Sequence, residues 1–336
     1  MLSNKHLHSE ILDIYTALNH ILLPSNNTPV ISVDWSCLSY ASYRYLLRAS
    51  ISCKGRSFVC YQEVRPGNHE NNNDAHLDFL KNLKAVLPSN IKPIIVTDAV
   101  FSPLWFKQVL SFGWEFVGRA RQNRRTFYSF KNDCWKKINE IYKSAKNKAS
   151  CLGSILLTKK NKLKCRMVTY KKTLKGRKKM NCKGTVDKGS YSIRNSESHR
   201  EPWILVTSLS NTVEASKVVK YYAKRMQIEE EFRDTKSTRY GFGLSESMTK
   251  IHVRVAVLLI INQLASLLCW VIACYAVHKK LHTDYHSNSL KSTNVLSAIT
   301  LGKRVFRKIK SLSAHLFRNG FKLFIKLIAR GEYCVS

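Results

Sequence analysis

The sequence predicts an α/β protein, and three observations lead to this prediction. Between residues 30 and 119, apolar strand-like runs alternate with amphipathic helical segments in the order β-β-β-α-β-α-β. Two of these strands end on an aspartate, at the edge where open α/β sheets commonly build their sites. The 336 residues are 44% hydrophobic, which is enough to bury a core in one large domain or in two.

Each element of this first part has its own signal in the sequence. Pro88 ends the pattern of one helix, and Gly113 ends the pattern of the next. The pair Lys54-Gly55 predicts a hairpin turn between the second and third strands. The expected elements are a helix at 7–22, strands at 30–34, 43–52 and 56–64, a helix at 73–87, a strand at 92–98, a helix at 103–112 and a strand at 114–119.

The composition changes near residue 122, and the chain is polar and short-stranded up to about residue 200. Strands are expected at 154–157 and 164–170. The run from Lys159 to Lys183 contains twelve Lys and Arg residues and no acidic residue. It is either a disordered basic loop or a loop that follows phosphate backbones, with Tyr170 and Leu174 interleaved. Both readings predict a surface element outside the first sheet.

The third part of the chain returns to regular structure. A strand is expected at 203–207, a helix at 221–236, and amphipathic helices around 289–329. Residues 255–277 form an apolar run that is long enough to cross a bilayer. Asn262 and Gln263 near the middle of this run, and the basic character of the rest, favour a buried core helix.

The helix at 221–236 contains no Gly or Pro and carries a stripe of four chemically different polar residues. At about 100° per residue, the residues that share this stripe are Tyr222, Arg225, Glu229 and Lys236. Such a stripe is either a solvated helix face or part of a site. The second reading is attractive because Arg and Lys bind phosphate, while a carboxylate binds a metal ion.

The charge of the chain restricts its partners. There are 56 basic and 22 acidic residues, giving a formal net charge of +34. Such a field favours a polyanion, either nucleic acid or an anionic membrane surface. The ten cysteines form no CxxC pair, which argues against a zinc site and against a small disulfide-bonded secreted domain. Reduced thiols in the cytoplasm are therefore expected.

Three carboxylates are candidates for a common site. Asp34 and Asp98 follow apolar strands, and Glu229 lies on a helix that follows a strand. Three carboxylates can hold two divalent cations about 3.5–4 Å apart, as phosphodiester chemistry requires. The alternative is that each aspartate only forms the turn after its strand.

The same residues resemble a known family. The Y-x2-R-x3-E-x6-K signature, the YREK motif of the IS-four family of bacterial insertion-sequence DDE transposases, is matched by Tyr222, Arg225, Glu229 and Lys236. Further stretches are similar to the IS-ten (Tn-ten) type: VDWS at 33–36, LPSN at 87–90, VTDAVF at 96–101, EPWILVTSL at 201–209 and KRMQIEEEFRDTKS at 224–237. The resemblance extends from about His6 to about residue 330.

This resemblance implies an RNase H-like catalytic core, a mixed sheet with flanking helices that is interrupted by a β-rich insertion and followed by a helical C-terminal part. The implied divisions are a remnant of an N-terminal helical region at 1–29, the first part of the core at 30–121, the basic insertion at 122–200, the second part of the core with the catalytic helix at 201–280, and a helical region at 281–336.

The resemblance also implies a chemistry. Asp34, Asp98 and Glu229 would be the catalytic residues and would bind Mg²⁺, with Mn²⁺ able to substitute. The activity would be cut-and-paste DNA transposition by two-metal-ion phosphoryl transfer. Its steps would be nicking at the 3′ end of the element, formation and opening of a hairpin, and strand transfer to target DNA.

DNA contacts are implied for six further residues. Tyr222, Arg225 and Lys236 would contact end phosphates and a flipped base. Trp203 would stack on that base, or else be an ordinary tryptophan of a core strand. Arg119 and Arg121 would bind backbone phosphates. The expected partners are transposon ends, target DNA and a second subunit in a synaptic dimer, with no membrane, in the nucleoid-associated bacterial cytoplasm.

The start of the chain distinguishes it from the family pattern. Relatives begin with an N-terminal helical DNA-binding region of several dozen residues, whereas here the first aspartate is already residue 34. The resemblance therefore implies a truncated copy. The main alternative is a catalytically or functionally decayed basic DNA-binding remnant that does not transpose. An RNase H-like nuclease and a membrane-surface protein are weaker alternatives.

Overall fold

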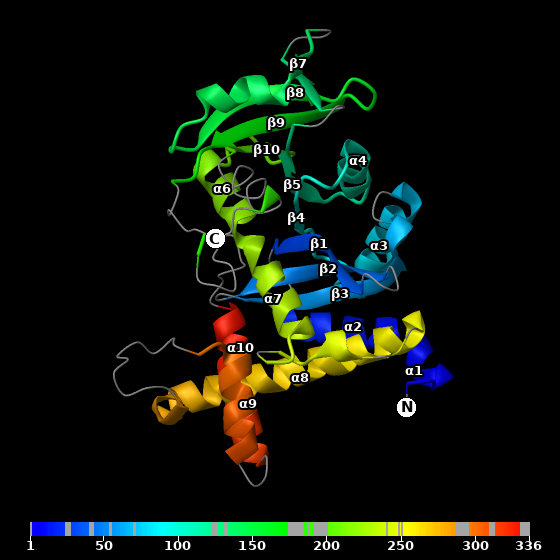
Figure 1. Cartoon of the computed structure of the whole chain (residues 1–336), viewed down its shortest axis with the longest axis vertical. Coiled ribbons are helices and arrows are strands. Elements are labelled where there is room, and N and C mark those ends of the chain that lie inside the picture. The colour runs from blue at the N-terminus through cyan, green and yellow to red at the C-terminus, as the bar shows by residue number, and fades with distance from the viewer. Residues whose placement is uncertain are drawn as a thin grey trace. The chain divides into compact units, whose positions relative to one another are not determined.

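The structure is a computed structural model, shown in Figure 1. It describes residues 2–23, 28–39, 44–53, 56–69, 72–122, 126–130, 134–173, 185–186, 189–190, 201–239, 241–247, 249, 251–285, 296–308 and 313–329. The chain divides into two compact units. Unit one comprises Met1–Pro93 and Arg225–Ser336, and unit two comprises Ile94–Lys224.

Unit one contains three antiparallel strands in the spatial order β3-β2-β1. The strands are β1 (Val30–Ser39), β2 (Arg44–Cys53) and β3 (Arg56–Pro66). The central strand β2 is buried at nearly every position. Its alternate residues Leu46, Arg48 and Ser50 contact helix α7 (Met226–Lys236), because successive side chains of a strand point to opposite faces. The face of β2 that contacts α7 is therefore partly polar.

Two helices near the N-terminus complete the core around β3. Helix α2 (Ile11–Leu22) and helix α3 (Asn73–Val86) contact each other and β3. The ring of Tyr61 on β3 lies 5.4 Å from the ring of Tyr15 and 5.3 Å from the ring of Phe79. Aromatic contacts of this kind bury large apolar surfaces, so they attach both helices to the sheet.

The C-terminal part of unit one is helical. Its helices are α8 (His252–His278), α9 (Ala298–Lys308) and α10 (Ala314–Ala329), and the last two cross α8 (Figure 1). A Cβ atom at Gly302 would lie 2.2 Å from the carbonyl oxygen of Cys269, and one at Gly320 would lie 2.4 Å from that of Val271. Glycine at these two positions therefore permits the close approach of both helices to α8.

Helix α8 is long and apolar enough, by length and composition, to cross a membrane. This is weak evidence, since the core helix of a globular protein has the same properties and half of its most apolar stretch is buried. Within unit one, α8 contacts β3, α9 and α10, and the buried side chain of Gln263 donates a hydrogen bond to the Val59 carbonyl oxygen. These contacts are those of a core helix.

Unit two contains a mixed sheet in the order β4-β5-β10-β9-β8-β6-β7. Its elements are β4 (Ile94–Thr97), α4 (Pro103–Ser111), β5 (Glu115–Ala120), β6 (Phe127–Ser129), β7 (Lys136–Lys137), β8 (Ser150–Leu157), β9 (Leu163–Tyr170), β10 (Trp203–Thr207) and α6 (Ala215–Lys224). Strands β4 and β5 are parallel and are connected through α4, and the other pairs are antiparallel. Helix α6 contacts β4, β5, β9 and β10.

The predicted α/β class and the predicted order of elements from residue 30 to residue 119 are confirmed. The predicted strands at 154–157, 164–170 and 203–207 correspond to β8, β9 and β10. The Lys54-Gly55 turn and Leu174 in the basic run lie outside the described residues. All eight cysteines in the described part of the chain are free thiols.

Two predicted helices are wrong in their continuity. The helix at 7–22 is divided at Glu10 into α1 (Lys5–Ser9) and α2. The helix at 221–236 is interrupted at Arg225, where the Ile228 N–H donates to the Arg225 carbonyl oxygen at 3.1 Å, three residues back rather than four. Residue 225 is also where the chain passes from unit two to unit one, a change of packing partner that helical periodicity does not report.

Candidate active site

In unit one, Arg225 lies between two of the predicted catalytic carboxylates. Its Nη1 donates to Asp34 Oδ2 at 2.8 Å, and its Nη2 donates to Glu229 Oε1 at 2.9 Å. The Arg225 side chain is 8% exposed and that of Glu229 is 45% exposed. Charge-assisted hydrogen bonds of this length are strong, particularly when one partner is shielded from water. Strand β1 and helix α7 thus direct their carboxylates at the guanidinium of Arg225.

The local structure fixes both carboxylates. The prediction that Asp34 ends its strand is wrong, because β1 continues to Ser39 and Asp34 lies in its middle, paired with Arg48 of β2. Asp34 Oδ1 accepts a hydrogen bond from the Trp35 backbone N–H at 2.9 Å. Glu229 lies in the first turn of α7, four residues after Arg225, so the two side chains are neighbours along the helix. Ile228 and Phe232 pack α7 against Leu46 of β2.

An open groove of about 530 Å³ lies beside this pair in unit one. It is lined by Asp34, Trp35, Ser36, Glu229, Phe232, Arg233, Lys236 and Ser237. Lys236 Nζ donates to Ser36 Oγ at 2.8 Å and to the Cys37 carbonyl oxygen at 3.1 Å. Partial burial lowers the pKa of the Lys236 ammonium below its ordinary value. Both acidic and basic side chains therefore line one groove.

In unit two, Asp98 follows β4 and accepts a hydrogen bond from Tyr222, the first residue of the predicted signature. The Tyr222 hydroxyl on α6 donates to Asp98 Oδ1 at 3.0 Å, and Tyr222 is buried. The ring of Tyr222 meets the ring of Trp203 edge-on at 4.9 Å. The helix α6 thus connects the second aspartate to strand β10.

Trp203 is also the centre of a small aromatic and basic cluster. On the neighbouring strand, Tyr170 is its register partner, with the two rings 5.8 Å apart. Lys172 Nζ lies 5.6 Å from the Trp203 ring centroid, within the range of a cation–π contact. Trp203 is only partly buried. The sequence predicts Tyr170 and Lys172 only as part of the basic run. Their proximity to Trp203 follows from the pairing of β9 with β10, which the sequence does not show.

The two predicted phosphate-binding arginines, Arg119 on β5 and Arg121 just after it, share one carboxylate. Glu201 Oε2 accepts from Arg121 Nε at 2.7 Å and lies 3.8 Å from Arg119 Nη2. Glu201 was missed in the sequence, although an acidic residue in so basic a chain is a usable signal. In the described state both arginines are therefore engaged by Glu201.

The residues of the predicted site thus fall into two groups. Unit one brings together Asp34, Arg225 and Glu229, with Lys236 in the same groove. Unit two brings together Asp98, Tyr222 and Trp203.

The donor set of unit one fits a divalent cation. Carboxylate oxygens are the ligands that Mg²⁺ and Mn²⁺ prefer, and those of Asp34 and Glu229 already converge on the cationic guanidinium of Arg225. Among the residues that the structure describes, no group of three or more His, Cys, Asp or Glu is arranged as a complete metal site. The pair is therefore a partial ligand set.

The strongly basic chain favours a nucleic-acid partner, and the groove combines carboxylates with Arg and Lys, which is the chemistry that phosphodiester cleavage uses. The family model of the transposase DDE domain matches residues 26–268, which is more than half of the chain, and the chain belongs to this family. No curated protein matches the chain.

Membership of this family has consequences for fold and activity. The mixed sheets with flanking helices and the helical C-terminal part are consistent with the RNase H-like fold of transposases. The family consists of enzymes that cleave and transfer DNA, that act on DNA as substrate, and that generally use Mg²⁺.

Proposed function

We propose that the chain is a DDE transposase of the IS-four family, IS-ten type, that performs cut-and-paste transposition. Its steps are nicking at the 3′ end of the element, formation and opening of a hairpin, and strand transfer. Asp34, Asp98 and Glu229 are the metal-binding catalytic residues. The observation that carries this proposal is the convergence of Asp34 and Glu229 on the guanidinium of Arg225, because two carboxylates that face one positive charge are placed to share a divalent metal ion, as phosphoryl transfer requires.

Each residue of the site has a task that follows from its chemistry. Asp34, Asp98 and Glu229 supply oxygen ligands, and the Tyr222 hydroxyl orients the Asp98 carboxylate through its hydrogen bond. When bound, Mg²⁺, or Mn²⁺ in its place, supplies Lewis-acid activation of the attacking hydroxyl and stabilises the leaving oxygen. Arg225 and Lys236 bind phosphates beside the scissile bond.

The remaining DNA contacts come from unit two. Trp203, partly exposed and flanked by Tyr170 and Lys172, stacks on an unpaired base, and Lys172 binds the phosphate next to it. Arg119 and Arg121 exchange Glu201 for backbone phosphates when DNA binds.

The larger organisation belongs to the same proposal. Residues 122–200 form a basic insertion between 30–121 and 201–280, with helical regions at 1–29 and 281–336. Support comes from the antiparallel strands β6 to β9, which all lie within the insertion. The enzyme acts as a dimer that joins two transposon ends, in the nucleoid-associated bacterial cytoplasm and without a membrane.

The test compares Glu229→Ala with the wild type on a duplex that carries the ends of the element. We expect Mg²⁺-dependent nicking and strand transfer by the wild type and no nicking by Glu229→Ala. Salt-sensitive DNA binding by the variant should remain largely intact, because one groove carboxylate contributes little to phosphate attraction. The readout is the yield of nicked, hairpin and joined products on a denaturing gel.

The competing function makes the opposite prediction. A basic DNA-binding remnant would bind the duplex with the same salt sensitivity, as a net charge of +34 alone supports. It would leave the ends uncut in Mg²⁺ and in Mn²⁺. That result for the wild type would refute the transposase proposal.

A further inference from the structure

The face of α7 that is turned away from the groove is polar, with Asp234 and Thr235 buried and Glu231 partly buried. Glu231 follows Glu229 by two residues, which places it about 200° around the helix at roughly 100° per residue. Its Oε2 accepts hydrogen bonds from Ser50 Oγ at 2.7 Å and from Ser57 Oγ at 2.6 Å. The helix that presents Glu229 to the groove is thus bound to β2 and β3 through a second carboxylate.

A buried arginine extends this network along the helix. Arg48 on β2 is 1% exposed, and both of its terminal nitrogens donate to Thr235 Oγ1 at 3.1 Å. Its Nε donates to Gln62 Oε1 on β3 at 2.8 Å, and its guanidinium lies 4.7 Å from the centroid of the Phe232 ring. Three side chains of α7, at positions 231, 232 and 235, therefore contact Arg48, Ser50 or Ser57.

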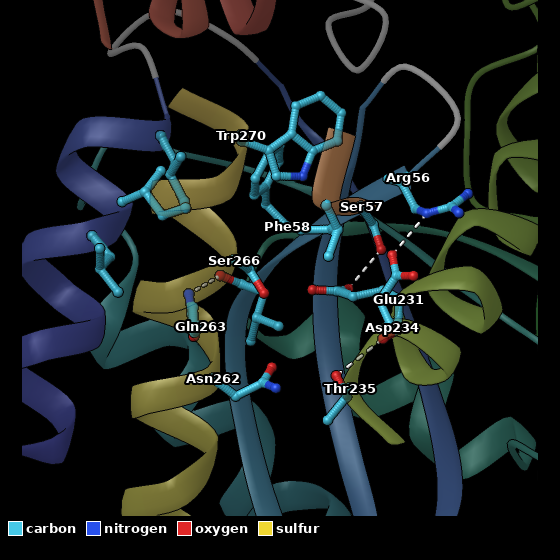
Figure 2. Close-up of a pocket in the computed structure, with 15 residues that line it drawn as sticks. Arg56, Ser57, Phe58, Glu231, Asp234, Thr235, Asn262, Gln263, Ser266 and Trp270 are labelled. Carbon is cyan, nitrogen blue, oxygen red and sulfur yellow. Dashed lines mark hydrogen bonds and ion pairs between the residues drawn. The ribbon is translucent and has the colours of Figure 1, made fainter. Parts of the chain in front are cut away.

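Apolar packing is incomplete on the same side of α7. A cavity of about 20 Å³, close to the size of one water molecule, lies among α7, β3 and α8. Figure 2 shows Ser57, Glu231 and Thr235 around it, with Asn262 and Gln263 of α8 on the other side. Arg56 and Asp234 also line this cavity and form an ion pair, with Arg56 Nε 2.8 Å from Asp234 Oδ2. Hydrogen bonds therefore add to the apolar packing of Ile228 and Phe232 in holding the helix here.

Such a network costs stability and gives directionality. The Arg48 guanidinium is almost fully buried and the Glu231 carboxylate lies against β2 and β3, and removing such charges from water is costly. Apolar residues of similar volume often stabilise a protein as well as a buried ion pair or better. What they lack is a preferred direction, so they do not define one rotation of a helix on a sheet.

We propose that Glu231 and Arg48 are positioning residues, which fix the rotation and the translation of α7 on β2 and β3 so that Glu229 faces Asp34. A slip of α7 by one residue would move it by about 1.5 Å and rotate it by about 100°, which would separate the two carboxylates. This inference rests on the proposed function for its catalytic meaning. The geometry itself lies entirely within unit one.

The test uses two variants that remove the directional contacts in different ways. Ser50→Ala with Ser57→Ala removes both donors to Glu231 with little change of volume. Arg48→Met with Glu231→Leu replaces the charges by apolar groups. We expect each pair to lower the Mn²⁺ affinity of the DNA-free protein and kcat for Mg²⁺-dependent nicking by roughly 10-fold or more, as loss of groups that orient metal ligands does. KM for DNA should stay within about twofold.

The matched control is Glu63→Gln. Glu63 lies on the same strand β3 and is hydrogen-bonded by Tyr61, Asn82 and Arg65, none of which belongs to α7. Glu231→Gln, which can still accept from the serines, should restore most of the Mn²⁺ affinity that Glu231→Leu loses. Mn²⁺ binding is followed by the electron paramagnetic resonance signal of the free ion, and folding by thermal unfolding.

The outcomes separate this inference from the proposed function. Wild-type Mn²⁺ affinity and kcat in both paired variants would overturn it. If the Arg48 and Glu231 pair fails to fold, the serine pair alone decides. If the wild type does not nick DNA, the proposed function fails. The positioning is then still tested by the Mn²⁺ affinity and by the hydrogen-exchange protection of the α7 amides. Unchanged values of both in the serine pair would refute the positioning role, and a loss of both would support it.

Discussion

In the proposed function, Arg225 links the binding of metal to the binding of DNA. In the DNA-free protein its guanidinium neutralises Asp34 and Glu229. Its proposed role in the complex is to bind a phosphate, and it cannot do both with the same N–H groups. A phosphate that draws the guanidinium away would leave the two carboxylates to a divalent cation. Because linkage is reciprocal, DNA would tighten metal binding and metal would tighten DNA binding.

Replacement of Arg225 by alanine should therefore raise the Mn²⁺ affinity of the DNA-free protein. We expect about a tenfold increase, because a hydrogen bond to a charged group contributes roughly 1.5 kcal/mol or more. The enhancement of Mn²⁺ binding by DNA should shrink in the same variant. Titration of Mn²⁺ with and without a duplex, followed by electron paramagnetic resonance, measures both quantities.

The control for this variant is Arg233→Ala. Arg233 also lines the groove, but its ion pair is with Glu230, which does not line it. Its removal should leave Mn²⁺ affinity within about twofold of the wild type, since an exposed ion pair contributes little. An Arg225→Ala protein that binds Mn²⁺ no better than Arg233→Ala would contradict the competition between guanidinium and metal.

The sequence predicts contacts between residues that are close along the chain, but not contacts between residues that are far apart along it. Arg225 and Glu229 are four residues apart, so their proximity follows from helical geometry. The hydrogen bond of Tyr222 to Asp98 joins residues 124 positions apart, and Arg121 meets Glu201 across 80 positions. Such pairings depend on the order of strands and helices in the sheet, which periodicity does not contain.

Among the elements, α7 shows how a sequence pattern can predict a helix correctly and still give the wrong limits for it. Its stripe of polar residues and its helix-forming composition predicted a helix, which is present as α6 and α7. The sequence around Arg225 contains no Gly or Pro that would predict the interruption of the helix there. Likewise, no pattern in the sequence marks Arg48, Ser50 and Ser57 as partners of α7, whose side chains they contact.

Helix α9 offers a sharper test of element packing. Replacement of Gly302 by alanine would place a methyl group 2.2 Å from the Cys269 carbonyl oxygen of α8, where backbone cannot yield easily. We expect the free energy of unfolding to fall by about 1–3 kcal/mol, the usual cost of overpacking. Urea unfolding followed by circular dichroism measures the change.

Arg307→Ala is the control for Gly302→Ala, because Arg307 is exposed on the same helix. Alanine and arginine have similar helix propensities, so this control should unfold within about 0.5 kcal/mol of the wild type. Equal stability of Gly302→Ala and the wild type would mean that α9 does not approach α8 as closely as the structure indicates.

At the scale of the whole molecule, the charge of +34 acts on every encounter with DNA. It attracts duplex of any sequence, since phosphate neutralisation carries no sequence information. The proposed site requires more than this diffuse attraction, because Trp203 must meet an unpaired base beside specific phosphates. The exposed lysines Lys171 and Lys172 directly follow β9, and Lys172 lies over the Trp203 ring.

Replacement of both Lys171 and Lys172 by glutamine should therefore change the salt dependence of DNA affinity in a defined way. The logarithm of the association constant falls with the logarithm of salt concentration, with a slope of about −0.9 for each phosphate contacted in duplex DNA. Loss of two contacts should make the slope shallower by about 1.8. Fluorescence anisotropy of a labelled duplex across a salt series gives this slope. The control is Lys84→Gln with Lys107→Gln, which removes the same charge from two exposed lysines on α3 and α4. If that control changes the slope as much, the net charge of the molecule and not the surface beside Trp203 determines how it holds DNA.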